Sequence, residues 1–375
     1  MLRKINDLKS TIRTHWRPIF IENPGAAIGG IVAIVCAFSA DYFASIFGGN
    51  IFTIMGYAFH FDAYLLGLFL YVGIYLIGVF YETRKFIFYN RRRLHLPTVV
   101  NIANPVNAQD ALKIFVQALA EKLRVSEKYL DELERYLMIT RDDLILSYVI
   151  NIHNPGQLYD MLAVIRHNLT RLQKQTPRDH ILELVYIGPV AIALWLGAVT
   201  HTESIALWPH SRGTEDSYPE RVGVSDHLRV ALAPGVVRRT QGVVMGDVLE
   251  GSKGGRWLVA LDLSGVPKLS NYQDYFEDID CCFYVRGVED SVRIGADEYI
   301  QYAQEVCQYI TDLNAGYAPR VMRLVCCVPI VLAILIGRYL GTLLPVEVAH
   351  FISEERRYIV LFNLNDARFR YQHIS

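Results

Sequence analysis

Residues 184–199 read LVYIGPVAIALWLGAV, and residues 324–337 read LVCCVPIVLAILIG. Both stretches are strongly apolar, but each is shorter than the ~20 residues that a membrane-spanning helix needs. A proline divides each stretch, and proline fits the first turn of a helix because its missing N–H has no helical partner there. Each stretch therefore predicts a buried strand followed by a buried helix.

The two stretches repeat one pattern, P-x-x-x-A-x-x-x-G. Three residues recur 140 positions later: Pro189, Ala193 and Gly197 in the first copy, and Pro329, Ala333 and Gly337 in the second. Small residues four positions apart share one face of a helix. We therefore expect each helix to press closely on a sheet.

Further elements flank each copy. We expect helices over 155–175 and 296–314, strands before them over 144–152 and 257–263, and later strands over 204–208, 346–351 and 358–363. The order β-α-β-α-β, found twice, predicts a mostly parallel α/β sheet in two Rossmann-like halves. Such sheets bind ligands beyond the carboxyl ends of their strands, so we expect a site between two similar crevices.

The N-terminal region predicts a membrane hairpin with spans over about 25–47 and 62–81. Five Lys or Arg precede the first span and five follow the second, whereas residues 48–62 contain none. Both termini should therefore be cytoplasmic. Asp41, Gly67 and Gly73 are candidates for a pore or for close helix contact. Alternatively, Asp41 reaches the outer interface and the glycines are ordinary for membrane helices.

Composition supports a chain that is partly in lipid and partly in water. Hydrophobic residues make up 52% of it and charged residues 20%. The 37 Lys+Arg and 38 Asp+Glu give a net charge of −1, which argues against polymeric nucleic acid as a partner. None of the six cysteines has C-x-x-C spacing, so no metal site is indicated.

The strand followed by GPVAIALWLG, and VPIVLAILIGRYLG followed by VEV, resemble the SAVED domain. That domain is a fusion of two CARF-like units that senses cyclic oligonucleotides in bacterial antiphage signalling. The resemblance covers residues 140–375 and implies halves over about 140–213 and 255–375. Residues 1–96 would then form the transmembrane hairpin and residues 97–139 a helical connector, either docked on the sensor or paired between subunits.

A SAVED domain behind a two-span hairpin resembles the membrane effectors of CBASS systems. The resemblance implies no cofactor and a cyclic di- or trinucleotide ligand made by a cGAS-like nucleotidyltransferase. It also implies a ligand-induced homo-oligomer that disrupts the bacterial inner membrane and causes abortive infection. The alternative is a four-span channel or transporter subunit, with residues 184–199 and 324–337 as its further spans. A sensor that also degrades its ligand is a third reading.

Two loops at predicted strand ends are candidates for binding phosphodiester groups. One holds Asn151, His153 and Asn154, and the other holds Ser264 and Gly265. Amide, hydroxyl and backbone N–H groups beside a helix start suit anions. Capping of the turns is the alternative role for each of these residues.

An aromatic and basic group follows the third strand of the first half. Trp208 could stack on a base while His210 and Arg212 meet phosphate, and Arg238 is a further phosphate candidate. The alternative places Trp208 in the core and the charged residues in solvent. The sequence contains no G-x-S-x-G, H-E-x-x-H or phosphate-loop motif, so we expect no enzyme.

Overall fold

The computed structural model describes residues 28–29, 31, 51–54, 57–60, 63–91, 94–102, 108–124, 128–149, 151–176, 180–201, 204–209, 221–224, 244–249, 254–263, 276, 278–287, 298–342 and 344–366. The chain divides into two compact units. Unit 1 comprises Met1–Leu94, Asp131–Met138 and Thr176–Asp179, and unit 2 comprises His95–Leu130, Ile139–Gln175 and His180–Ser375.

The first sheet of unit 2 has the strand order β4-β3-β5-β6-β7. Strands β3 and β4 are parallel, as are β5 and β6, whereas β7 is antiparallel to β6. In chain order the elements are β3 (Leu94–Asn101), α5 (Ala108–Leu123), α6 (Tyr129–Leu137), β4 (Ile145–Ser147), α7 (Pro155–Gln175), β5 (His180–Ile187), α8 (Val190–Val199), β6 (Ile205–Leu207) and β7 (Val222–Val224).

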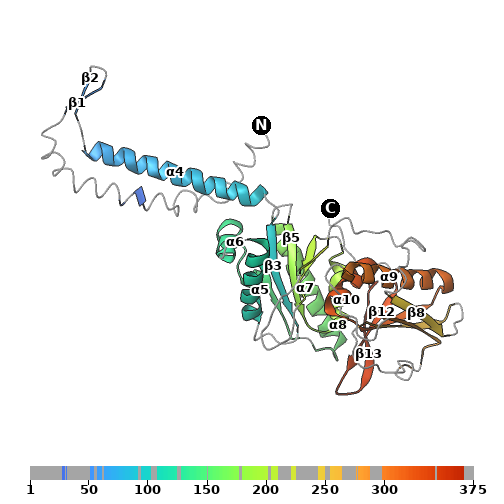
Figure 1. Cartoon of the computed structure of the whole chain (residues 1–375). Coiled ribbons are helices and arrows are strands. Elements are labelled where there is room, and N and C mark those ends of the chain that lie inside the picture. The colour runs from blue at the N-terminus through green and yellow to red at the C-terminus, as the bar shows by residue number, and fades with distance from the viewer. Residues whose placement is uncertain are drawn as a thin grey trace. The chain divides into compact units, whose positions relative to one another are not determined.

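The second sheet has the order β13-β12-β11-β9-β10-β8. Its central strands are parallel, and β8 and β13 run antiparallel at the two edges. The elements are β8 (Val244–Leu249), β9 (Arg256–Asp262), β10 (Cys281–Gly287), α9 (Glu298–Tyr317), β11 (Val321–Cys327), α10 (Ile330–Leu340), β12 (Val346–Ile352) and β13 (Arg357–Asn363). They are the gold-to-red elements of Figure 1.

The two sheets repeat one topology, which confirms the predicted duplication of a mostly parallel α/β unit. Leaving β8 aside, β10-β9-β11-β12-β13 occupies the positions of β4-β3-β5-β6-β7. Helices α9 and α10 likewise correspond to α7 and α8 in chain order. We call the part from β3 to β7 the first half and the part from β9 to β13 the second half.

The first half begins earlier than the predicted boundary at residue 140. Strand β3 lies between β4 and β5, so part of the predicted connector over 97–139 belongs to the sheet. The proline at position 97 suggested a boundary, but it is buried within β3, and the ladder with β4 starts only at Val99. The predicted strand over 257–263 therefore corresponds to β3, and the counterpart of β4 is β10.

The two proline-split stretches form buried strands and helices, as predicted. Residues 191–199 of α8 are all buried, as are residues 331–337 of α10. Pro189 and Pro329 are the N-cap residues of these helices, and the carbonyl of each accepts a hydrogen bond from the first turn. Because both helices lie inside an α/β domain, the structure argues against reading these stretches as membrane spans.

Helices α8 and α10 pack on each other through the repeated glycines. A Cβ added to Gly197 would lie 1.9 Å from the Ile334 carbonyl oxygen, and one added to Gly337 would lie 1.9 Å from the Leu194 carbonyl oxygen. The contact is reciprocal, as expected of a two-fold-related pair. The prediction that the small residues press each helix on a sheet was therefore wrong for the glycines, which instead bring two helices together.

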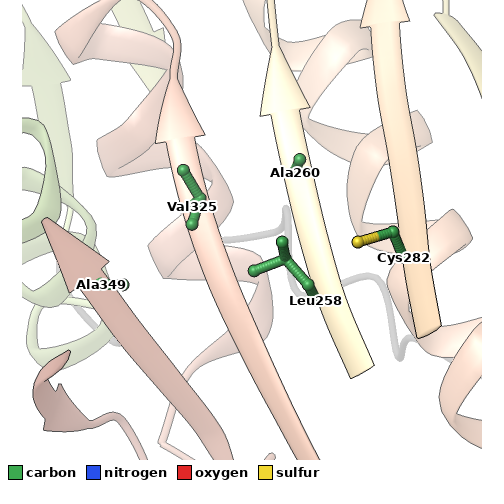
Figure 2. Close-up of a cluster of buried hydrophobic side chains, with 5 residues drawn as sticks. All are labelled: Leu258, Ala260, Cys282, Val325 and Ala349. Atoms are coloured by element: carbon green, nitrogen blue, oxygen red, sulfur yellow. The ribbon is translucent and has the colours of Figure 1, made fainter. Parts of the chain in front are cut away.

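A cluster of small and branched side chains fills one part of the second half. Figure 2 shows it spread over neighbouring strands, with Val325 on β11, Cys282 on β10, and Leu258 and Ala260 on β9. Each of these side chains is at most 1% exposed. Larger side chains pack against this cluster, among them Phe276, Tyr284 and Tyr358, so this part of the parallel sheet is buried.

Unit 1 contains a hairpin of β1 (Ile51–Ile54) and β2 (Tyr57–His60), followed by the long helix α4 (Ala63–Arg91). This helix includes the second predicted span. Of the first predicted span, only residues 28–29 and 31 are described, and they are helical. A Cβ added to Gly29 would lie 3.1 Å from the Tyr71 ring and carbonyl, so the chain at Gly29 closely approaches α4.

The predicted pore residues are only partly covered by the structure. Asp41 lies outside the described residues, Gly67 lies in α4, and a Cβ at Gly73 would meet nothing within 4 Å. In the described part of the chain, no helix is both long and apolar enough to cross a membrane.

Candidate functional site

A cavity of about 370 Å³ lies between the two halves of unit 2. The first half contributes the carboxyl ends of β5 and β6, and the second half contributes the first turns of α9 and α10. The lining residues are Leu184, Tyr186, Ile187, Leu207, Trp208, Pro209, Tyr299, Pro329, Ile330, Val331 and Ile334. Its position matches the predicted crevice at strand ends.

Three aromatic rings and an otherwise apolar wall give the cavity its chemistry. Burial raises the pKa of the Tyr186 hydroxyl well above its usual value, so the group stays neutral and donates a 2.9 Å hydrogen bond to the Pro189 carbonyl. The first turn of α10 also lines the cavity, and the first N–H groups of a helix lack helical partners. The site can therefore hold a flat ring on its aromatic wall and an anionic group beside α10.

A buried carboxylate holds Trp208 in place. Glu183 on β5 has no exposed side-chain surface, and its Oε2 accepts a 2.7 Å hydrogen bond from the Trp208 indole Nε1. The Trp208 ring also packs edge-on against Phe115 of α5, with 5.3 Å between ring centroids. Trp208 is therefore a core residue that also lines the cavity, and its predicted stacking on a base stays a prediction.

Arg221 and His95 complete the environment of Glu183. The Arg221 guanidinium donates to both carboxylate oxygens at 2.7 and 3.0 Å, and His95 Nδ1 lies 2.6 Å from Oε1. Since a carboxylate only accepts, the Nδ1 atom carries the proton. Burial by itself would raise the pKa of Glu183, but the hydrogen bonds from His95, Arg221 and Trp208 lower it overall.

The second half carries a cluster of opposite sign at the equivalent strand position. Arg323 on β11 lies 140 residues after Glu183, and it donates to Asp278 at 2.8 Å and to Glu347 at 2.9 Å. Its guanidinium also lies 5.0 Å from the centre of the Phe276 ring. Hydrogen bonding to Arg323 lowers the pKa of Asp278.

The predicted loop residues of the first half act as turn and helix caps. Asn154 Oδ1 accepts a 3.3 Å hydrogen bond from the N–H of Gln157 at the start of α7, and Asn151 Oδ1 accepts one of 3.1 Å from the N–H of His153. His153 Nδ1 lies 3.3 Å from Glu355 in the turn between β12 and β13. All three residues follow β4, but none lines the cavity. Their predicted contact with ligand stays a prediction.

The other predicted ligand residues lie outside the described part of the chain: His210, Arg212, Arg238, Ser264 and Gly265. In the sequence, His210 comes directly after Pro209, which lines the cavity, and Arg212 comes two residues later. Sequence reasoning missed Tyr186, Tyr299 and Glu183. The repeat could have indicated Tyr299. This residue lies in the first turn of α9, and the cavity brings the first turns of α9 and α10 against strand ends of the first half. Among the described residues, no group of three or more His, Cys, Asp or Glu is placed to hold a metal ion.

The fold is thus a duplicated, mostly parallel α/β fold with one aromatic cavity described between its halves. Among solved structures, the chain is similar to the Acinetobacter baumannii Cap4 SAVED/CARF-domain containing receptor with the cyclic trinucleotide 3'3'3'-cAAA. The TM-score is 0.44 and the identity 10%, over 91% of this chain and 77% of that chain. The same receptor with 2'3'3'-cAAA gives the same values.

A third similar structure is the Moraxella osloensis Cap4 SAVED/CARF-domain containing receptor. Its TM-score is 0.41 and its identity 10%, over 88% of this chain and 65% of that chain. No family model matches the chain. No curated protein matches it either.

Proposed function

We propose that the chain is a SAVED-type receptor for a cyclic di- or trinucleotide, and that it acts as a membrane effector in CBASS antiphage defence. The observation that carries the proposal is the aromatic cavity between two duplicated α/β halves. Tyr186, Trp208 and Tyr299 supply stacking surface for a base, and the first turn of α10 supplies N–H groups for a phosphate.

The size of the cavity suggests which part of the cyclic nucleotide it holds. At about 370 Å³ it is near the lower end of small-molecule sites, which span about 300–1,000 Å³. It therefore suits one nucleobase of the ligand, with the phosphodiester ring lying outside it. A phosphate of that ring would then lie beside the first turn of α10, which lines the cavity.

A cavity-filling variant tests the binding step. Ile330→Trp adds an indole at the first residue of α10, where Ile330 lines the cavity. Val190→Trp is the matched control, because Val190 is the first residue of α8 and lies 140 positions earlier. We expect calorimetric titration of the full chain with a panel of cyclic di- and trinucleotides to show binding to wild type and V190W and none to I330W. Equal binding by both variants would remove the cavity from the proposal.

The membrane step is supported by the character of α4. Large apolar side chains are exposed around this helix, including Leu76, Ile77 and Phe80 at 57%, 69% and 66%. Its residues from Leu70 to Tyr81 include no charged side chain, and a helical segment that is apolar on all sides needs either a protein core or lipid around it. We propose that the N-terminal hairpin lies in the bacterial inner membrane, with both termini cytoplasmic and the soluble halves facing the cytoplasm.

Ligand-induced clustering would link binding to membrane damage. One chain bound to ligand associates with others, and their hairpins gather and disrupt the bilayer, which causes abortive infection. The nucleotide is bound and not consumed, and a cGAS-like nucleotidyltransferase supplies it. Proteoliposomes loaded with dye test both points. We expect release only after the cognate nucleotide is added, and chromatography should recover that nucleotide intact. Ligand binding without any release would contradict the membrane step.

A further inference from the structure

Helix α6 has residues in both compact units. Tyr129 and Leu130 belong to unit 2, and residues 131–137 belong to unit 1. The helix is nine residues long, and its side chains Tyr129, Leu133 and Tyr136 are at most 5% exposed. This helix of about two and a half turns therefore contributes residues to both units.

The first residue of α6 is hydrogen-bonded to the start of β3. The Tyr129 hydroxyl donates to the carbonyl of His95 at 2.6 Å and accepts from its N–H at 3.2 Å. The His95 side chain in turn meets Glu183, and Glu183 holds the Trp208 indole that lines the cavity. Each step from the cavity to α6 is thus a direct contact, and the carboxylate at its centre is fully buried.

The last turns of α6 hold a second buried carboxylate. Glu82 of α4 is 1% exposed, accepts a 3.2 Å hydrogen bond from the Tyr136 hydroxyl, and lies 3.3 Å from Arg135 Nη2. The Lys85 ammonium lies 4.8 Å from the centre of the Tyr81 ring and 5.6 Å from that of Tyr136. Glu82 comes directly after the second predicted span, which ends at Tyr81.

We propose that α6 couples the cavity to the membrane hairpin, with Glu82 as the positioning residue through which it acts on α4. A buried carboxylate cannot leave its hydrogen-bond donors without a large desolvation cost, so α6 and this part of α4 move together. Ligand contact with Trp208 shifts Glu183 and His95, the shift reaches α6 through Tyr129, and Glu82 passes it to α4. This inference rests on the proposed function, because it needs a ligand in the cavity and a hairpin that responds.

Two variants break the link at Glu82, and one breaks it at the other end of α6. Glu82→Gln removes the charge that faces Arg135, Tyr136→Phe removes the hydroxyl donor, and Tyr129→Phe removes both hydrogen bonds to His95. We expect nucleotide affinity to stay within about twofold of wild type, since these sites lie away from the cavity. Nucleotide-induced dye release should fall about tenfold, within the ordinary range of coupling between sites.

Glu134→Gln is the matched control, because it makes the same chemical change at an exposed position of the same helix. It should behave as wild type. Thermal unfolding of each variant verifies that it is folded. A folded E82Q or Y136F that releases dye as wild type does would overturn this inference and leave the proposed function intact. A wild type that binds no nucleotide would overturn the proposed function itself.

Hydrogen exchange in detergent gives a readout that does not require membrane leakage. In wild type, we expect nucleotide to change the exchange of amides in both α6 and residues 82–91. In Y129F the change should stop before α6, and in E82Q it should reach α6 but not residues 82–91. Identical exchange patterns in wild type and both variants would overturn the coupling.

Discussion

The two halves of unit 2 share a topology but differ in what they bury. At the same strand position the first half buries an acid, Glu183, against Arg221 and His95, and the second half buries a base, Arg323, between two acids. The first half places Tyr186 and Trp208 at its strand ends, where the second half has Cys326 and Ala349 on β11 and β12. Duplication therefore preserved the backbone and the helix contact, while charge and aromatic content diverged.

The largest effect should come from the feature that the halves share. In Gly197→Ala and Gly337→Ala, the new methyl group would meet a backbone carbonyl oxygen at 1.9 Å, which a side-chain rotation cannot relieve. We expect each variant to lose about 3 kcal/mol of stability, measured by denaturant unfolding of the full chain in detergent.

Gly316→Ala in α9 is the control, since a Cβ there meets nothing within 4 Å. It should change stability by less than about 1 kcal/mol. A large loss in only one of G197A and G337A would contradict the reciprocal packing of α8 and α10.

The next largest effect should distinguish the ion cluster around Glu183 from the one around Arg323. Glu183→Gln leaves the Arg221 guanidinium without its counter-charge beside a fully buried site, so we expect a loss of about 3 kcal/mol. Arg323→Gln should cost less, about 1–2 kcal/mol, because Asp278 and Glu347 are 39% and 26% exposed and keep contact with water. Equal losses of stability in the two variants, measured by thermal unfolding, would mean that the deeper burial of Glu183 does not make its cluster more important for stability.

Acid should weaken the first half through Glu183. The pKa of Glu183 is lower in the folded state than in the unfolded state, where it is about 4.3. Ionised Glu183 therefore stabilises the fold at pH values above about 4.3, and this stabilisation is lost as the pH falls through the pKa of the folded state. The unfolding free energy of wild type should therefore fall below pH ~4, whereas that of E183Q should fall less steeply. Parallel curves for the two proteins between pH 7 and pH 3 would exclude Glu183 as a source of the acid sensitivity.

The smallest effect concerns the capping residues of α7. Asn154→Ala removes the side-chain acceptor for the N–H of Gln157 and should cost about 1 kcal/mol. If capping is its main role, nucleotide affinity measured by calorimetry should not change. A loss of affinity without a loss of stability would instead favour the predicted contact of this loop with ligand.

The sequence predicted the duplicated core because the signal was local. The P-x-x-x-A-x-x-x-G repeat and the apolar runs around it lie within single strand–helix segments, and the structure has strands and helices there. Strand β3 was missed because a proline within it and basic residues before it are typical of a boundary. The burial of that proline depends on neighbours, β4 and β5, that lie far along the chain.

The centre of the candidate site could not be predicted in the same way. The partners of Glu183 lie 25, 38 and 88 residues away in sequence, so no local pattern joins them. Trp208 was predicted because an aromatic residue follows a strand there. Glu183, which accepts the hydrogen bond from its indole, was not predicted. The reciprocal contact of Gly197 and Gly337 likewise needs both halves, and one copy of the repeat alone suggested packing on a sheet.

The most direct test of the account compares one pair of equivalent tyrosines. Tyr299 lies at the start of α9 and lines the cavity, whereas Tyr159, 140 positions earlier in α7, does not. Loss of a stacked base contact is worth about 1–3 kcal/mol, or about 5- to 150-fold in affinity. Titration of the cognate cyclic nucleotide should therefore show such a loss in Tyr299→Ala and wild-type affinity in Tyr159→Ala. Equal affinities in the two variants would contradict a nucleotide site between the halves.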